Sequence, residues 1–232
     1  MSFWNRFPSN RLLVDLSLWS ADLTDLATDV RRTAPFADLF HIDVADGHFV
    51  DQLLFFPDVV AALRRLTSTP MHVHLMVDNP ARIAPAFAEA GADLITVHAE
   101  TEHVSQAINV IRSHGKAAGL ALRLDTDPAT IVDHLAQVDA VVAICTPLGS
   151  KGTDASSEMP ARIQALRHLI SQHPRRAAIR IVADGGIRRH TVPRFAEAGV
   201  HAVVAGSLVF EAPDPADTVD WLRAAGLWAA GS

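Results

Sequence analysis

The 232-residue chain contains one cysteine, Cys145, and only two lysines, Lys116 and Lys151. A single cysteine cannot form an intrachain disulfide, which fits a reducing compartment, so we expect a cytoplasmic protein. An enzyme that forms a Schiff base needs a lysine buried at the end of a strand. Neither lysine occupies such a position in the elements predicted below, which argues against that chemistry.

Positive charge and long apolar runs are also scarce. Lysine and arginine number 20 against 26 acidic residues, a net charge of -6. The chain therefore has no basic excess to neutralise a phosphate backbone, and nucleic acid is not an expected partner. No apolar run approaches the roughly 20 residues of a membrane span. Residues 1–10 lack the continuous apolar segment of a secretory signal, so no membrane association is expected either.

The sequence is rich in short runs of Val, Ile and Leu that alternate with longer amphipathic segments, a pattern typical of βαβ units. Eight strands are predicted, at Leu12–Ser17, Leu39–Val44, Met71–Met76, Leu94–His98, Ala117–Leu122, Ala140–Cys145, Ile179–Ala183 and Ala202–Ala205. Helical segments follow them, beginning near Asp22, Pro57, Pro80, Val104, Pro128, Ser157, His190 and Asp214. Eight such units favour a closed (β/α)8 TIM barrel of the α/β class, although an open doubly wound sheet has the same local pattern. We predict one barrel domain over residues 1–232, with a short N-terminal extension at 1–10.

Histidines and aspartates occur at the ends of several predicted strands. Residues two apart on a strand share a face, so His41 lies beside Asp43, and His72 beside His74. With Asp184, which follows the seventh strand, four of these side chains could converge on the barrel axis: His41, Asp43, His74 and Asp184. Nitrogen and oxygen donors of this kind suit Zn²⁺, Mn²⁺, Fe²⁺ or Co²⁺. For each residue alone, a hydrogen-bonded interior group is the favoured interpretation, whereas for the four together burial without a compensating cation is costly, and the pattern leaves the metal and the interior-group interpretations equally open.

Glycine-containing turns follow the last two predicted strands, at Gly185–Gly186 and Gly206–Ser207. Backbone amides in such turns bind anions, and barrel enzymes often hold phosphate at this place. Each turn by itself is more typical of an ordinary loop that needs glycine for a positive φ. Their occurrence after adjacent strands favours a phosphate site.

Taken together, these segments resemble the ribulose-phosphate 3-epimerase family, which includes D-allulose-6-phosphate 3-epimerase. The matching segments run in the family's order from about Leu12 to Phe210: Leu16–Asp22, His41–Val50, Val73–Val77, Val97–Glu100, Asp184–Ile187 and Val204–Ser207. The resemblance implies a metal-dependent 3-epimerase of a ketose phosphate that acts by proton transfer through an enediolate. The implied substrate is D-ribulose 5-phosphate or D-xylulose 5-phosphate, or a related pentulose, hexulose or tetrulose phosphate.

The resemblance also implies roles for individual residues. One divalent ion, zinc in the first place and otherwise Mn²⁺, Fe²⁺ or Co²⁺, would be bound by His41, Asp43, His74 and Asp184. Asp43 and Asp184 would in addition be the catalytic acid and base. The residues expected to contact substrate or its phosphate are Ser17, His74, Met76, Gly149, Ser150, Lys151, Gly152, Gly186, Gly206 and Ser207.

Some positions depart from the family pattern. The loop Pro147–Thr153 replaces the usual Asn-Pro-Gly-Phe-Gly-Gly-Gln, and His72 and Arg123 stand where Asp and Asn are typical. Ala45 and Ile144 occupy positions where methionines are common. These changes leave the sugar unidentified. A sugar-phosphate decarboxylase or aldolase on the same barrel, and a non-catalytic sugar-phosphate-binding protein, are the alternatives.

Three further expectations concern other parts of the chain. Glu100 either orients His98 or caps the following segment. Trp221 and Trp228 are expected to be core or subunit-interface residues. Helix faces rich in Ala and Leu are compatible with a homo-oligomer.

Overall fold

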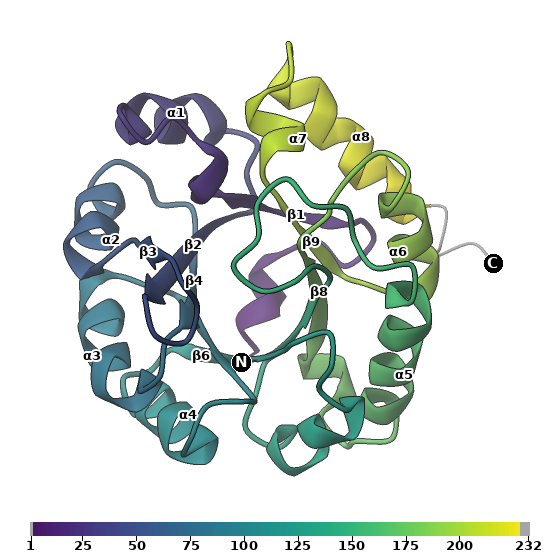
Figure 1. Cartoon of the computed structure of the whole chain (residues 1–232). Helices are drawn as coiled ribbons and strands as arrows, with labels where there is room; N and C mark the ends of the chain where they lie inside the picture. Colours follow the sequence, from purple (N-terminus) through teal and green to yellow (C-terminus); the bar gives the residue numbers. More distant parts are fainter. Residues whose placement is uncertain (1, 228–232) are drawn as a thin grey trace.

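The computed structural model describes residues 2–227, and its centre is a closed barrel of eight parallel strands surrounded by helices (Figure 1). The barrel strands are β1 Leu13–Ser17, β2 Leu39–Asp46, β4 Met71–Met76, β5 Leu94–His98, β6 Ala117–Leu122, β7 Ala140–Ile144, β8 Arg180–Asp184 and β9 Ala202–Ala205. Their order is β1-β9-β8-β7-β6-β5-β4-β2, and β1 also pairs with β2. This last pairing closes the barrel and confirms the predicted TIM-barrel fold.

One strand of the structure was not predicted. The two-residue β3, Leu53–Leu54, pairs antiparallel with the end of β2, where Ala45 lies opposite Leu54. It is too short to give a sequence signal of its own.

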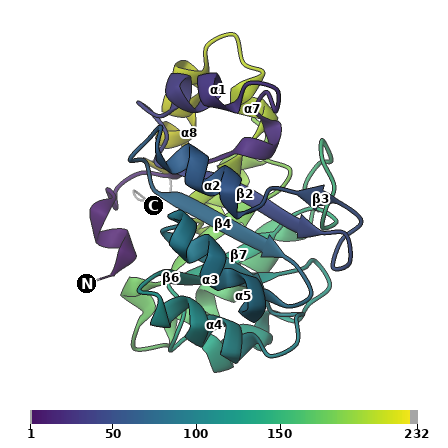
Figure 2. The ribbon, with the colours of Figure 1, turned by 90° about the vertical axis from the view of Figure 1, so that its left-hand side faces the viewer.

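The helices lie outside the barrel (Figures 1 and 2). The α-helices are α1 Leu26–Thr33, α2 Pro57–Arg64, α3 Pro80–Ala90, α4 Val104–Ser113, α5 Met159–Ser171, α6 Val192–Ala198, α7 Ser207–Phe210 and α8 Pro215–Leu227. The segment predicted to begin near Pro128 is a 3₁₀ helix, η3 Pro128–His134, rather than an α-helix. The first helix begins later than predicted, because the Asp25 side chain caps it by accepting from the Thr28 amide.

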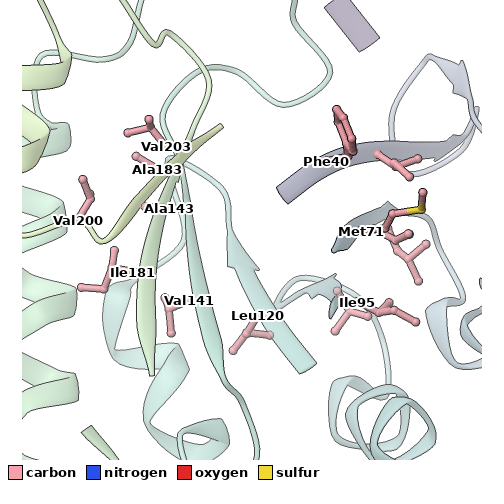
Figure 3. Packing of buried hydrophobic residues seen from close by; sticks show 14 of the residues in the cluster. Phe40, Met71, Ile95, Leu120, Val141, Ala143, Ile181, Ala183, Val200 and Val203 are labelled. Carbon is pink, nitrogen blue, oxygen red and sulfur yellow. The ribbon is translucent and has the colours of Figure 1, made fainter. Parts of the chain in front are cut away.

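The strands are buried on both faces because each face packs against a different layer. Between the strands and the helices lies a large apolar cluster, which includes Phe40, Met71 and Ile95 (Figure 3). The alternate residues point into the barrel, where Leu39, Val142 and Val204 belong to a separate apolar cluster. Polar side chains at these inward-pointing positions therefore lie in the barrel interior, away from the helices.

The N-terminal segment lies at the end of the barrel opposite the carboxyl ends of the strands (Figure 2). Its 3₁₀ helix, η1 Phe3–Arg6, adds Phe3 and Trp4 to the interior apolar cluster. The Trp4 indole donates to the carbonyl of Asp139 at 2.5 Å. This packing covers the amino end and leaves the carboxyl end for a site, as is general in such barrels.

Two of the remaining expectations concern the last helix and membrane spans. Trp221 on α8 is partly buried, packs against the apolar layer and lies under the Arg189 guanidinium at 4.7 Å, whereas Trp228 lies outside the described residues. Within residues 2–227, no helix combines the length and apolarity needed to cross a bilayer.

Candidate active site

Four polar side chains meet inside the carboxyl end of the barrel. His41 and Asp43 extend from β2, His74 from β4 and Asp184 from the end of β8. Strand alternation places them there, because β2 and β4 run in register with Asp43 opposite His74. The structure thus brings together the four residues that the sequence predicted as a group. His41 and His74 are almost completely buried, which makes uncompensated charge at this point costly.

The distances within this group fit a single small cation. The Asp43 carboxylate Oδ1 lies 3.3 Å from His41 Nε2 and 3.3 Å from His74 Nδ1. Asp184 Oδ2 lies 3.6 Å from the same His41 nitrogen and 3.4 Å from the same His74 nitrogen. Ligand bonds of about 2.0–2.1 Å in a tetrahedron place neighbouring donor atoms about 3.3–3.4 Å apart. The cluster can therefore hold a metal ion with little rearrangement.

The hydrogen bonding of His41 supports the same fit. Its Nε2 is buried and has no hydrogen-bond partner among the described residues. A buried polar atom without a partner is costly, and a metal ion would satisfy it.

The electrostatics of the cluster also favour a cation. Burial alone would lower the pKa of His41, but the carboxylates of Asp43 and Asp15 outweigh it and hold that pKa well above the ordinary value. Burial would raise the pKa of Asp43, yet the two histidines hold it far below the usual range. The Asp43 carboxylate is therefore ionised and requires a positive charge nearby. A proton on His41 supplies that charge, and a divalent metal ion would supply it equally.

His74 has a hydrogen-bonded chain behind it. Its Nε2 lies 2.8 Å from Nε2 of His98, whose Nδ1 lies 3.0 Å from the Glu100 carboxylate. Burial lowers the pKa of His98 to about 4, so its ring is neutral near pH 7. Since Glu100 can only accept, His98 donates from Nδ1 and accepts at Nε2 from His74. Glu100 thus orients His98, and it also accepts from the backbone amide of Arg123.

This hydrogen-bonded series from His74 to Glu100 uses Nε2 of His74, so its Nδ1 faces the two aspartates. When one ring nitrogen of a histidine donates a hydrogen bond, the other ring nitrogen is the one available to a metal. His74 would bind through Nδ1, whereas His41 would bind through Nε2.

Asp43 has separate environments for its two oxygens. Oδ1 faces the histidines, and Oδ2 accepts a hydrogen bond from the Ser17 hydroxyl at 3.0 Å. One oxygen is therefore available to a metal while the other is held toward the pocket.

An open pocket lies above the cluster, and all of the residues predicted to contact substrate line it: Ser17, His74, Met76, Gly149, Ser150, Lys151, Gly152, Gly186, Gly206 and Ser207. The loop between β7 and α5 crosses the mouth of the barrel (Figure 1). Lys151 on this loop donates to the Trp19 carbonyl at 2.9 Å. Gly186 has a φ of +62° and packs against Ala155, so that a side chain there would collide with the loop.

Several residues near the site were not predicted. Trp19, Thr146 and Arg188 also line the pocket, and Arg188 adds a cation near the glycine turns. Asp15 lies below the cluster on β1 and contacts His41. The alternation rule was sufficient to find Asp15, because it precedes Ser17 by two residues on the same strand.

Fold and site together define a (β/α)8-barrel enzyme with a buried His/Asp cluster and an adjoining polar pocket. A sequence model described as the ribulose-phosphate 3 epimerase family matches residues 13–210. Ribulose-phosphate 3-epimerase from Mycobacterium tuberculosis (strain ATCC 25618 / H37Rv) is 38% identical over 212 residues, covering 91% of each chain. The enzyme of that name from Bacillus subtilis (strain 168) is 34% identical over 210 residues, covering 89% of this chain and 96% of its own. The chain belongs to the ribulose-phosphate 3-epimerase family, and it is an isomerase.

Solved structures of other barrels share the fold. KGPDC from Streptococcus mutans superposes with a TM-score of 0.71 at 16% identity, over 95% of this chain and 100% of that one. Orotidine 5'-phosphate decarboxylase from Pyrococcus horikoshii OT3 gives 0.67 at 14% identity, over 92% and 99%. At such low identity, these similarities support the fold alone.

Proposed function

We propose that the protein inverts carbon 3 of a ketose phosphate by moving one proton off that carbon and another onto its opposite face. The single observation that carries the proposal is the pair of aspartates, Asp43 and Asp184, that face one buried pair of imidazoles beneath an open pocket. D-ribulose 5-phosphate and D-xylulose 5-phosphate are the first substrates to test, because the relatives are named for ribulose phosphate. A related pentulose, hexulose or tetrulose phosphate is the wider class.

Two carboxylates are needed because inversion requires proton transfer on both faces of a planar intermediate. Asp43 and Asp184 extend from β2 and β8, which are separated in the barrel by β1 and β9. They therefore approach the cluster from different sides. We assign one to remove the proton at carbon 3 and the other to return a proton from the opposite face, with their roles exchanged in the reverse direction.

A divalent ion fits the cluster, and His41, Asp43, His74 and Asp184 would hold it. When bound there, it would supply Lewis acidity that stabilises the negative charge developing on the substrate oxygens. Zinc is the ion that we expect first, since its ligands are commonly imidazole and carboxylate in a four-coordinate arrangement.

Phosphate binding is assigned to the turns after β8 and β9. Gly186, Gly206 and Ser207 line the pocket on the side of these turns, and their amides would bind the phosphate oxygens. Lys151, on the loop above, would add positive charge and hold the loop over the bound sugar. Ser17 would hold the Asp43 oxygen that transfers the proton.

The lyase alternative is less well supported. The positions of β4 that share the inward face are His72, His74 and Met76, so this strand offers no lysine to the reacting carbon. The Lys151 ammonium is engaged by the Trp19 carbonyl.

The test is to replace each aspartate separately by asparagine and to follow two reactions. Asp43→Asn and Asp184→Asn should each lower the rate of epimerisation by about 10²–10⁴, the usual contribution of general acid or base catalysis. A variant that retains its metal should still exchange the carbon 3 proton of one epimer with D₂O while failing to form the other epimer.

Bound metal must be measured in both variants, because each aspartate is also a proposed ligand. Asp133→Asn, which changes a carboxylate in η3 outside the site, is the control and should keep full activity. Undiminished epimerisation in either site variant would disprove the two-carboxylate assignment.

A further inference from the structure

His41 contacts three carboxylates, and only two of them belong to the proposed metal site. Its Nε2 faces Asp43 and Asp184, and its Nδ1 lies 3.1 Å from Asp15 Oδ2 on the opposite side of the ring. Asp15 extends inward from β1 and is 1% exposed. A carboxylate in this position has no part in the mechanism above.

A second histidine shares the same oxygen. His72 Nδ1 lies 2.6 Å from Asp15 Oδ2, and His72 Nε2 lies 2.7 Å from the Thr96 hydroxyl. All four side chains of this group, Asp15, His41, His72 and Thr96, are essentially inaccessible to water. A distance of 2.6 Å is typical of a strong hydrogen bond and is shorter than the separation of two donors on one metal ion, about 3.3 Å. A proton, not a second metal, therefore joins Asp15 to His72.

The protons in this group can be placed by elimination. One oxygen of Asp15, Oδ2, lies within hydrogen-bond distance of Nδ1 of both histidines, and a carboxylate oxygen shared by two ring nitrogens accepts from both. Both His41 and His72 must then donate to it from Nδ1. The 3.3 Å approach of these two Nδ1 atoms is not a hydrogen bond, because both carry protons, and it results from their sharing one acceptor. His72 Nε2 is left to accept from Thr96.

We infer that Asp15 is a positioning residue that fixes His41 in the Nδ1-protonated tautomer, with His72 and Thr96 holding Asp15 in place. The inference rests on the metal site of the proposed function. A carboxylate behind a histidine ligand orients the ring and makes its other nitrogen a better donor. In this chain the carboxylate behind His41 is therefore that of Asp15 on β1.

The charge balance supports this role. No lysine or arginine among the described residues forms an ion pair with Asp15, Asp43 or Asp184, the three carboxylates around His41. The second oxygen of Asp15 is buried and accepts no hydrogen bond from the described residues. The negative charge of three carboxylates therefore surrounds one imidazole, and it favours a cation bound on the Nε2 side of the ring.

The experiment measures zinc affinity by competition with a chromophoric chelator. Asp15→Asn should weaken zinc binding about 10- to 100-fold, as is usual for loss of a carboxylate behind a ligand. His72→Leu removes the donor that holds Asp15 and should weaken binding about 10-fold, at the low end of the same range. His72→Asn should restore near wild-type affinity, because its amide nitrogen occupies the place of Nδ1 and can still donate.

Asp139→Asn is the matched control for loss of a buried carboxylate. Asp139 is 6% exposed and binds Arg112 and Arg175 at the other end of the barrel. This variant should lose stability without losing zinc affinity. Equal affinities in wild type and Asp15→Asn would overturn the positioning role while leaving the proposed function intact.

A measurement on the unmodified protein covers the case in which Asp15→Asn does not fold. Long-range ¹H–¹⁵N spectra of the zinc-loaded wild type should show His41 protonated at Nδ1 and metal-bound at Nε2. The opposite assignment would overturn the inference. Failure of the wild type to bind any divalent ion would overturn both this inference and the metal site of the proposed function.

Discussion

Zinc should raise the thermal stability of this protein through His41. The ligand side chains are already close together, with donor atoms 3.3–3.6 Å apart, so little of the binding free energy is needed to reorganise them. At a free zinc concentration about 1,000 times the dissociation constant, binding to the folded state alone adds about 4 kcal/mol to the free energy of unfolding. Each kcal/mol raises Tm by about 2–4 °C in a domain of this size, so the expected shift is about 8–16 °C.

The assay is calorimetry of chelator-treated protein before and after zinc is added. His41→Asn keeps a donor near Nδ1 for Asp15 but lacks Nε2, so it should lose most of the shift. The chain has 12 histidines, and zinc bound elsewhere is a real alternative. His201→Gln changes a largely buried histidine outside the cluster and should retain the full shift. An equal shift in His41→Asn and wild type would refute the reasoning, because the stabilising zinc would then bind at another place.

Three other predictions concern single residues. Lys151→Ala removes the hydrogen bond to the Trp19 carbonyl and a positive charge beside the pocket. This variant should raise KM for the phosphorylated ketose about 10-fold, which is the effect of losing one charged hydrogen bond. An unchanged KM would show that Lys151 is not part of the substrate site. Burial and the nearby Asp184 carboxylate raise the pKa of Cys145, so the native protein should resist iodoacetamide and react only after denaturation; rapid native alkylation would contradict this. Burial, with Arg180 and Arg167 nearby, lowers the pKa of His201 from 6.5 to about 4. The unfolded chain therefore binds more protons between these values, and stability should fall as the pH drops through this window, by about 3 kcal/mol at most for this group. Denaturant titrations should show a weaker pH dependence in His201→Gln, and an unchanged dependence would refute the assignment.

Much of the barrel and of the His/Asp cluster at its carboxyl end follows from strand periodicity. The eight predicted strands match the observed ones to within two residues at each end, because a strand buried on both faces gives a compact apolar run. The same alternation placed His41 with Asp43, and strand ends in a barrel meet on one face. Local patterns were thus sufficient to predict that these side chains converge.

Features that depend on contacts between distant segments were not predictable in this way. The N-terminal segment gave no sign that Phe3 and Trp4 would enter the barrel interior. The chain from His74 through His98 to Glu100 needs two neighbouring strands in a particular register, and the sequence left two roles open for Glu100. Asp15 was missed for a different reason, because it could have been predicted. The alternation that places His41 and Asp43 on one face of a strand does the same for Asp15 and Ser17.

Exchange of the carbon 3 proton tests the proposed function most directly. The zinc-loaded protein would be incubated in D₂O with ketose 4-, 5- and 6-phosphates, and deuterium at carbon 3 would be followed by NMR together with the appearance of the epimer. We predict that at least one of these sugars forms its epimer with deuterium at carbon 3, and that chelation of the metal abolishes the reaction. A metal-loaded protein that leaves the carbon 3 proton of every ketose phosphate unexchanged would contradict the account.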